Sequence, residues 1–362
     1  MSDWPDRRVL DLFGIDLPIL LAPMAGPGTP ELAIAVCEAG GLGSLPCSQL
    51  DPSRLTRAIE AIRAATIRPL NLNFFCHDTP TRDEAQVKAW RGDLAPYYRE
   101  LGLDPDEPAP VAARRPFDAA ACAIVEAHRP EVVSFHFGLP APDLLARVKA
   151  TGAKIIASAT TVAEALWLET RGCDAVIAMG WEAGGHRGSF LNLDPYAQVG
   201  TFALVPQVVD AVRLPIIAAG GVADGRGIVA ALALGASAVQ IGTAYLLCPE
   251  ARLSPMHRAA LDTASDDATR LTNVFTGRPA RGLVNRIMRE QGPISATAPP
   301  FPLAAEALGP LRARAEAQGS GDFTPLWSGQ AARLARALPA GELTRRLAEE
   351  ALAKMSSSAP SA

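Results

Sequence analysis

A short apolar run, then a Gly-rich turn, then an Ala- and Leu-rich stretch recurs along this 362-residue chain until about Cys248. The recurrence predicts strands that alternate with helices, and right-handed crossovers make such strands parallel. The strand segments are apolar along their whole length, as expected when both faces of a sheet are covered. The predicted strands are 19–22, 41–45, 69–73, 132–135, 154–157, 175–178, 215–218 and 238–241.

Eight strands of this kind predict an α/β fold of the (β/α)8 TIM-barrel class, with a doubly wound open sheet as the alternative. We prefer the barrel because the count reaches eight before the pattern stops. In addition, "APMAGPGTPE" after the first strand does not match the GxGxxG of dinucleotide-binding sheets. The predicted helices are 30–39, 52–65, 118–128, 142–151, 162–171, 203–212 and 226–234.

Two regions depart from this rhythm. Residues 76–117 are polar and rich in proline and charge, which indicates an insertion into a barrel that spans 1–255. Residues 256–355 are expected to form a C-terminal helical region that packs on the barrel from the substrate side. Within it, 272–290 is predicted to be a loop feeding a helix, and 329–355 two helices split near Pro339. The tail 356–362 is predicted to be disordered.

Composition limits the function classes. Hydrophobic residues make up 49% of the chain and the net charge is −4, so there is no electrostatic reason to expect nucleic acid or an anionic membrane as partner. The start "MSDWPDRRVL" is too polar for a signal peptide, and no apolar stretch has the length of a membrane span. Six cysteines without CxxC spacing indicate reduced thiols. We expect a cytoplasmic protein and leave a homodimer open.

Glycines follow the last two predicted strands, where TIM barrels commonly bind phosphate. Gly220 and Gly221 in "PIIAAGGVADGRG" let backbone N–H groups approach phosphate oxygens. Gly242 and Thr243 in "AVQIGTAYL" add an N–H and a hydroxyl, and the following helix is expected to contribute its positive end. One glycine pair indicates only a tight turn, but two such loops favour a phosphate-bearing ligand.

Other strand ends carry ring-binding and proton-transfer candidates. Asn73 ends the third strand, where an amide can contact a heterocycle or simply form a turn. His136 in "SFHFG" and His186 in "WEAGGHRGSF" follow the fourth and sixth strands. A single histidine there is more often structural, whereas two at one barrel mouth indicate chemistry. Neither lies in an HxH or HExxH motif, so proton transfer ranks above metal binding and no metal site is predicted.

Taken together, these segments resemble the nitronate monooxygenases, formerly called 2-nitropropane dioxygenases, from about residue 10 to 350. The resemblance implies an FMN-bound TIM barrel with an added helical domain. It implies oxidation of alkyl nitronates such as propionate 3-nitronate by O2 to a carbonyl compound and nitrite, through a flavin semiquinone and without a nicotinamide. The segments that carry it are "APMAG", "NLNFF", "VVSFHFGLP", "EAGGHRG", "AAGGVADGRG", "QIGTAYLLC", "TGRPARGL" and "PLWSGQ".

The resemblance also implies roles for residues. His186 is implied to be the base that removes the α-proton of a neutral nitroalkane, and His136 to lie on the substrate side. Because a nitronate is an anion, we expect protonated His186 or Arg187 to supply positive charge. The implied contacts to FMN are Ala22, Pro23, Met24, Asn73, Met179, Gly184, Gly185, Gly220, Gly221, Gln240, Ile241, Gly242 and Thr243.

The chain departs from the family pattern at Met179, where many members have a glutamine that contacts flavin. That change removes a hydrogen bond worth about 0.5–1.5 kcal/mol. Phe301 stands where a tyrosine is common, and His257 is a further candidate in the same region. The alternative functions are an FMN-dependent NAD(P)H reductase of the enoyl-ACP reductase type, which shares the glycine–histidine loop, and a flavin-binding module without turnover.

Overall fold

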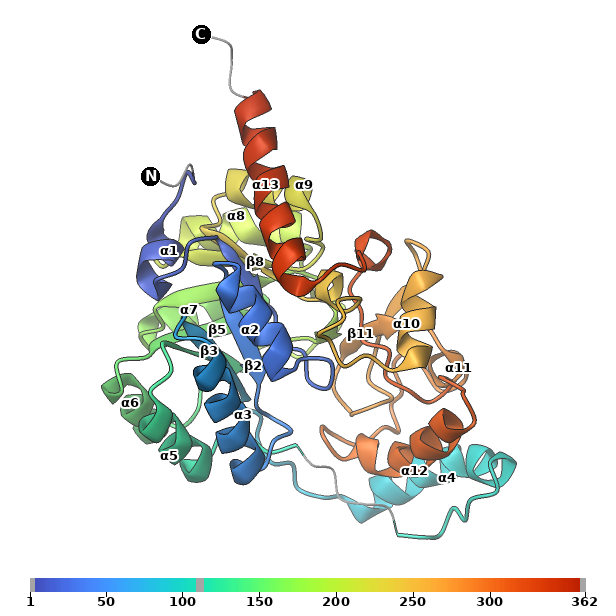
Figure 1. The fold of residues 1–362 in the computed structure, drawn as a ribbon. Coiled ribbons are helices and arrows are strands. Elements are labelled where there is room, and N and C mark those ends of the chain that lie inside the picture. Colours follow the sequence, from blue (N-terminus) through green and yellow to red (C-terminus); the bar gives the residue numbers. More distant parts are fainter. Residues whose placement is uncertain (1–3, 109–113, 359–362) are drawn as a thin grey trace.

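The computed structural model describes residues 4–108 and 114–358, and its centre is a barrel of eight parallel strands (Figure 1). The strands follow the order β1-β9-β8-β6-β5-β4-β3-β2. The ring closes between β1 and β2, where the N–H of Leu21 donates to the carbonyl of Leu42 at 2.9 Å. The predicted TIM barrel is therefore confirmed, and the alternative of a doubly wound open sheet is excluded. The strands are β1 (Ile19–Leu21), β2 (Gly43–Pro46), β3 (Leu70–Phe75), β4 (Val132–His136), β5 (Lys154–Ala159), β6 (Ala175–Met179), β8 (Ile216–Ala219) and β9 (Ala238–Ile241).

The helices between the strands begin and end within two residues of the prediction. Helix α3 shows the local reason, because the Asp51 side chain accepts from the N–H of Arg54 and Pro52 occupies the first turn. Leu55, Ile59 and Ile62 then bury one face of the helix against the barrel. After α1 (Arg8–Phe13), these helices are α2 (Pro30–Glu38), α3 (Pro52–Ala65), α5 (Ala119–His128), α6 (Pro142–Ala150), α7 (Val162–Thr170), α8 (Thr201–Ala211) and α9 (Gly225–Ala233).

The outer ring of helices is completed by the end of the chain. Helix α13 (Ala340–Ser358) packs against α9 and α2, and Figure 1 shows it beside α9. Leu343, Leu347 and Ala351 are fully buried, which places one stripe of the helix against the barrel. The helix includes the first three residues of the predicted tail 356–362, and residues 359–362 lie outside the described part of the chain.

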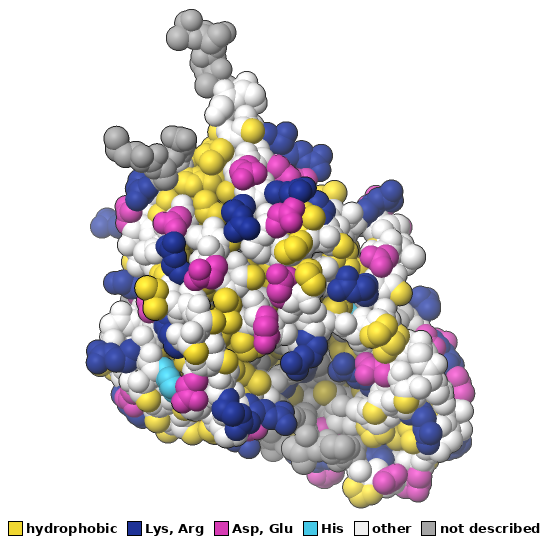
Figure 2. Space-filling model, in the orientation of Figure 1, with side chains coloured by type: hydrophobic (Ala, Val, Ile, Leu, Met, Phe, Trp, Pro, Cys, Tyr) yellow, Lys and Arg dark blue, Asp and Glu magenta, His cyan; other side chains and the backbone are white. Residues whose placement is uncertain are grey.

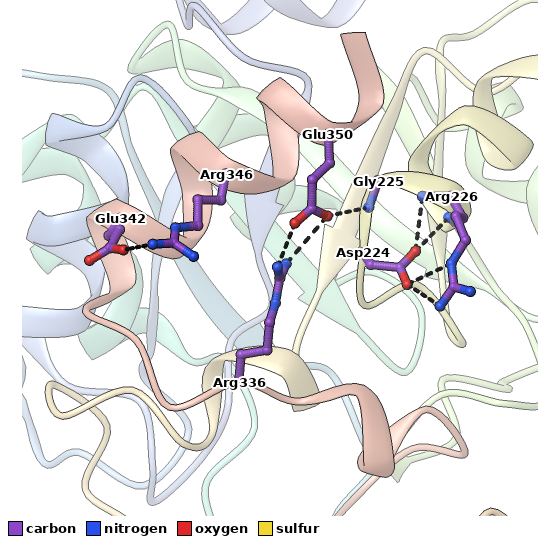
Figure 3. A network of polar contacts seen from close by, with 8 residues as sticks. Asp224, Gly225, Arg226, Arg336, Glu342, Arg346 and Glu350 are labelled. Atoms are coloured by element: carbon purple, nitrogen blue, oxygen red, sulfur yellow. Dashed lines mark hydrogen bonds and ion pairs between the residues drawn. The ribbon is translucent and has the colours of Figure 1, made fainter. Parts of the chain in front are cut away.

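Carboxylates join α13 to the start of α9, as Figure 3 shows. The Glu350 carboxylate accepts from the N–H of Gly225 at 3.1 Å and forms an ion pair with Arg336. The Asp224 carboxylate accepts from the N–H groups of Arg226 and Gly227. The first N–H groups of α9 are therefore already paired with protein carboxylates.

The polar insertion contains a long helix that joins the C-terminal region rather than the barrel. Helix α4 (Glu84–Glu100) packs on α12 (Ala304–Ala317), and Figure 1 shows the two side by side at the edge of the molecule. Trp90 and Tyr98 are each 1% exposed, and their polar atoms donate to the carbonyls of Ala304 and Ala307. Burial of a large apolar side chain stabilises the fold by about 1.5–3 kcal/mol, so two segments far apart in the sequence form one apolar cluster.

The structure corrects the prediction for 272–290. A small antiparallel sheet of β10 (Thr269–Thr272), β11 (Ala280–Leu283) and β7 (Gly185–His186) lies there, followed by the short helix α11 (Arg286–Glu290). The strand was missed because "ARGL" carries a charge and a glycine where an apolar run was expected. Arg281 is 2% exposed and donates to the carbonyl of Trp181 and the hydroxyl of Thr269.

The prediction of two helices in 329–355 is also half wrong. Only a single 3-10 turn, η2 (Ala332–Leu334), precedes α13. The remaining helices are η1 (Thr243–Tyr245) and α10 (Pro255–Asp262).

Within residues 4–108 and 114–358, no helix combines the length and apolar character that a membrane crossing requires. On the face drawn in Figure 2, basic and acidic side chains are interspersed.

Candidate active site

A cavity of about 530 Å³ lies at the carboxyl ends of the barrel strands, within the usual size range for ligand sites. His136, His186 and the residues expected to contact FMN all line it, with one exception. Ile241 is 1% exposed and does not reach the cavity, and its carbonyl instead accepts from the N–H of Ala22. The lining set from the prediction is Ala22, Pro23, Met24, Asn73, His136, Met179, Gly184, Gly185, His186, Gly220, Gly221, Gln240, Gly242 and Thr243.

The glycine loops after β8 and β9 present backbone donors to this cavity. Gly220 and Gly221 have φ of +111° and +74°, a left-handed conformation that favours glycine. Among the described residues, none accepts a hydrogen bond from the N–H groups of Gly220, Gly221, Gly242 or Thr243. A Cβ added at Gly242 would lie 3.2 Å from that of Ala22, so a side chain there would crowd the cavity wall. These orphaned donors suit phosphate oxygens.

The expected contribution of a helix end to this site needs correction. The first N–H groups of α9 are taken by Asp224 and Glu350. The element that begins at Thr243 is only the 3-10 turn η1. A phosphate here would therefore be held by loop N–H groups rather than by the positive end of a long helix.

Polar side chains on the barrel strands face the same cavity. Oε1 of Gln240 is buried and accepts no hydrogen bond from a described residue. The Asn73 amide nitrogen donates to the Ser134 hydroxyl at 2.9 Å, which leaves its carbonyl oxygen for a ligand donor. Met179 ends β6 with 7% exposure and adds an apolar contact. The Gln240 Oε1 and the Asn73 carbonyl oxygen can therefore accept hydrogen bonds from N–H groups at the edge of a heterocycle.

Glycines bring His186 to the mouth of the barrel. The chain turns after β6, and Gly185 has φ of +73°. A Cβ at Gly184 would lie 2.5 Å from the nitrogen of Gly329, so only glycine lets that C-terminal segment approach. His186 then pairs with Ala280 of β11. The histidine is thereby held between the barrel and the small antiparallel sheet.

Aromatic rings enclose the His186 imidazole. The ring centroids of Phe301 and Trp327 lie 5.3 and 5.4 Å from it, and those of Phe75 and Phe137 lie 6.2 and 6.1 Å away. Burial, reinforced by the positive charge of Arg114, lowers the pKa of His186 well below its usual range. The imidazole is therefore neutral at neutral pH. The expectation that protonated His186 supplies positive charge is wrong for this site.

His136 holds a neighbouring loop. Its Nε2 donates to the backbone carbonyl of His186 at 3.1 Å, so its Nδ1 accepts from the Ser158 hydroxyl at 2.7 Å. Burial lowers the pKa of His136 to about 3. With both ring nitrogens engaged by the protein, His136 positions His186, although its ring also lines the cavity.

Arg187 does not supply the positive charge expected of it. Its side chain is 1% exposed, and its guanidinium donates to the carbonyls of Met179 and Gly180 and to the side chain of Gln198. These bonds tie the end of β6 to the loop that carries His186. The guanidinium is absent from the cavity lining in the described part of the chain.

Sequence reasoning missed the part of the lining that comes from outside the barrel. Phe301 and His257 were named as candidates; His257 lines the cavity, and Phe301 packs on His186. Ser158 had a detectable signal, since it is the polar residue near the end of the fifth strand. Polar and aromatic lining residues on loops and helices distant in sequence had no such signal, among them Gln49, Arg114, Arg252, Ser254, Arg312, Thr324, Pro325 and Trp327.

Comparisons with known proteins agree on one family. Residues 6–350 match the family described as nitronate monooxygenase. Nitronate monooxygenases of Paraburkholderia phytofirmans and Pseudomonas aeruginosa are each 43% identical, over 97% and 95% of this chain and 96% and 98% of theirs. The structure of nitroalkane oxidase from Streptomyces ansochromogenes has a TM-score of 0.88 at 39% identity, covering 97% of this chain and 99% of that one. FabK from Thermotoga maritima has a TM-score of 0.75 at 31% identity and covers 97% of each chain.

Proposed function

The chain belongs to the nitronate monooxygenase family, and on this premise we propose that it oxidises alkyl nitronates with O2 in a reaction that depends on FMN. The substrates include compounds such as propionate 3-nitronate, and the products are a carbonyl compound and nitrite. The observation that carries the proposal is that the neutral imidazole of His186 lines the same cavity as four backbone N–H groups without a protein acceptor.

The residues of the cavity fit FMN. The N–H groups of Gly220, Gly221, Gly242 and Thr243 would hold the phosphate. The unpaired Oε1 of Gln240 and the spare carbonyl of Asn73 would accept from the ring system or ribityl chain. When bound, FMN supplies the redox chemistry that connects the nitronate to O2.

A side chain of the protein removes the substrate proton. With a neutral nitroalkane as substrate, His186 takes the α-proton, which it can do because its burial keeps the imidazole unprotonated. Thr276 orients the ring through a hydrogen bond of 2.9 Å to Nε2, and the surrounding aromatic side chains exclude water. A nitronate has already lost this proton, so its oxidation needs His186 less.

The test uses the purified protein. A flavin absorption spectrum and release of nitrite from alkyl nitronates in air are the expected results. A colourless protein that does not take up added FMN would contradict the cofactor assignment. Anaerobic mixing with NADPH separates the reductase alternative, because rapid bleaching of the flavin without nitrite release would favour a FabK-like activity over the one proposed here.

A further inference from the structure

Arg114 lies near the end of the insertion 76–117 and lines the active-site cavity, yet part of its guanidinium lacks a partner. Its Nη1 atom is buried and forms no hydrogen bond with any residue in the described ranges 4–108 and 114–358. A buried guanidinium nitrogen without an acceptor costs free energy, and a ligand that supplies an acceptor is one explanation for keeping it. Burial lowers the pKa of Arg114 to about 10, so the side chain stays positively charged at neutral pH.

The Arg114 guanidinium and the imidazole of the proposed base pack on the same aromatic ring, that of Phe301. Its central carbon is 5.5 Å from the centroid of the Phe301 ring, which itself lies 5.3 Å from the imidazole of His186. Among the charged groups that lower the pKa of His186, Arg114 has the largest effect. Arg114 therefore acts electrostatically on the position of His186, where the α-carbon of a substrate would lie.

Two other arginines near the site, Arg278 and Arg312, already contact protein groups. Arg278 donates to the carbonyl of Ser189, and its guanidinium stacks on the Phe137 ring at 3.9 Å. Arg312 lines the cavity but donates to the Glu316 carboxylate at 2.7 Å. Nη1 of Arg114 has no partner among the described residues, and the guanidinium lies against the Phe301 ring that packs on His186, so it is placed to receive an anion there.

We propose that Arg114 is a catalytic residue that binds the two nitro oxygens of the substrate while His186 faces the α-carbon. The proposal rests on the proposed function, since it names the receptor for the anionic group of the nitronate. A nitronate is planar and carries its charge on two oxygens with carboxylate-like spacing. The arginine fork can therefore bind it through two parallel N–H···O bonds.

The same contact would assist proton removal from a neutral nitroalkane. The C–H bond breaks, the proton moves to His186, the electron pair forms the C=N bond, and the negative charge appears on the nitro oxygens. Arg114 faces that developing charge and stabilises it more than it stabilises the neutral substrate. Arg114 thus contributes to both substrate classes, whereas His186 acts only on the neutral one.

The test compares Arg114→Met and Arg114→Lys with the control Arg115→Met, which removes an exposed charge from the adjacent position. Nitrate, a planar oxyanion, is the binding probe, and its dissociation constant is measured by titration calorimetry of the FMN-loaded proteins. We expect Arg114→Met to raise this constant and the KM for ethyl nitronate by about tenfold to a hundredfold. Arg114→Lys is expected to fall between, and Arg115→Met to stay within about twofold.

Two results would overturn the proposal. One is unchanged nitrate affinity in Arg114→Met; should that variant fail to fold, unchanged affinity in Arg114→Lys counts equally. The other is loss of affinity for propionate 3-nitronate alone, with ethyl nitronate unaffected, since Arg114 would then bind the distant carboxylate. Failure of the proposed function looks different, because the wild-type protein would itself release no nitrite while the nitrate titration still reports on Arg114.

Discussion

The hydroxyl oxygen of Thr276 lies 2.9 Å from Nε2 of His186, so the proposed base is oriented by a residue 90 positions away in the sequence. The same hydroxyl lies 3.5 Å from the carbonyl of Arg278. A hydroxyl that donates to this carbonyl accepts from Nε2–H, so Nδ1 is unprotonated and, under the proposed function, is the nitrogen that would receive the proton.

The first prediction concerns this hydrogen bond. Thr276→Val keeps the shape of the side chain but removes the acceptor for Nε2–H, so the imidazole loses its fixed tautomer. We expect turnover of neutral nitroethane to fall by about tenfold and oxidation of ethyl nitronate to change by less than about threefold. Steady-state kinetics on both substrates measure the split. Thr276→Ser should restore the wild-type ratio, and equal losses on the two substrates would argue against an orienting role.

His186→Asn separates the two substrate classes more completely. Asparagine cannot accept the α-proton, so turnover of neutral nitroalkanes should fall by at least about a hundredfold. Much of the nitronate oxidation should remain, because that substrate arrives deprotonated. Nitrite release from nitroethane and from ethyl nitronate, measured at matched flavin content, checks the prediction. A parallel loss on both substrates would contradict the assignment of His186 as the base.

The phosphate cradle can be tested by crowding it. A side chain at Gly242 begins 3.2 Å from Cβ of Ala22 and projects beside the donors proposed to hold the phosphate. We expect Gly242→Val to lose bound FMN on ultrafiltration while its circular dichroism spectrum stays that of a folded protein. Gly92→Val is the control, because Gly92 lies on α4 with open space around its Cβ position. Full flavin retention in Gly242→Val would place the phosphate elsewhere.

The attachment of α13 to the barrel is expected to depend on Glu350 (Figure 3). Glu350→Gln weakens both the ion pair with Arg336 and the bond from the N–H of Gly225. The free energy of unfolding should fall by about 1–2 kcal/mol, as measured by urea denaturation. Glu342→Gln, which removes the exposed pair with Arg346, should change it by less than about 0.5 kcal/mol. Similar values for the two variants would show that the contact with α9 adds nothing.

Buried histidines predict a loss of stability in mild acid. Burial lowers the pKa of His136 to about 3 and those of His77 and His257 to about 4, whereas the unfolded chain protonates them near pH 6.5. Below pH 6.5 the unfolded state binds more protons, so the free energy of unfolding falls as the pH falls. The slope approaches about 1.4 kcal/mol per histidine per pH unit. Denaturation between pH 7.5 and 5 should give a shallower slope for His257→Leu, and identical slopes would refute the prediction.

The barrel and its glycine loops could be predicted because local patterns report them directly. A strand buried on both faces must be apolar throughout, and Ile19, Leu20 and Leu21 are each 0% exposed. Gly221 needs a positive φ that other residues rarely adopt, so glycine at that loop is a local requirement as well. The position of His186 at a strand end followed from the same rhythm, because all strands of a parallel barrel end on one face.

Only the tertiary structure decided which side chains surround that histidine. Arg114 lines the cavity and Thr276 contacts His186 from segments held in place by long-range contacts, in which α4 packs on α12 and β11 pairs with β7. Arg187 lies next to His186 in the sequence, yet its side chain turns into the protein to bind backbone carbonyls. Neighbours in sequence need not share an environment, since burial and side-chain direction are set by long-range packing rather than by local periodicity.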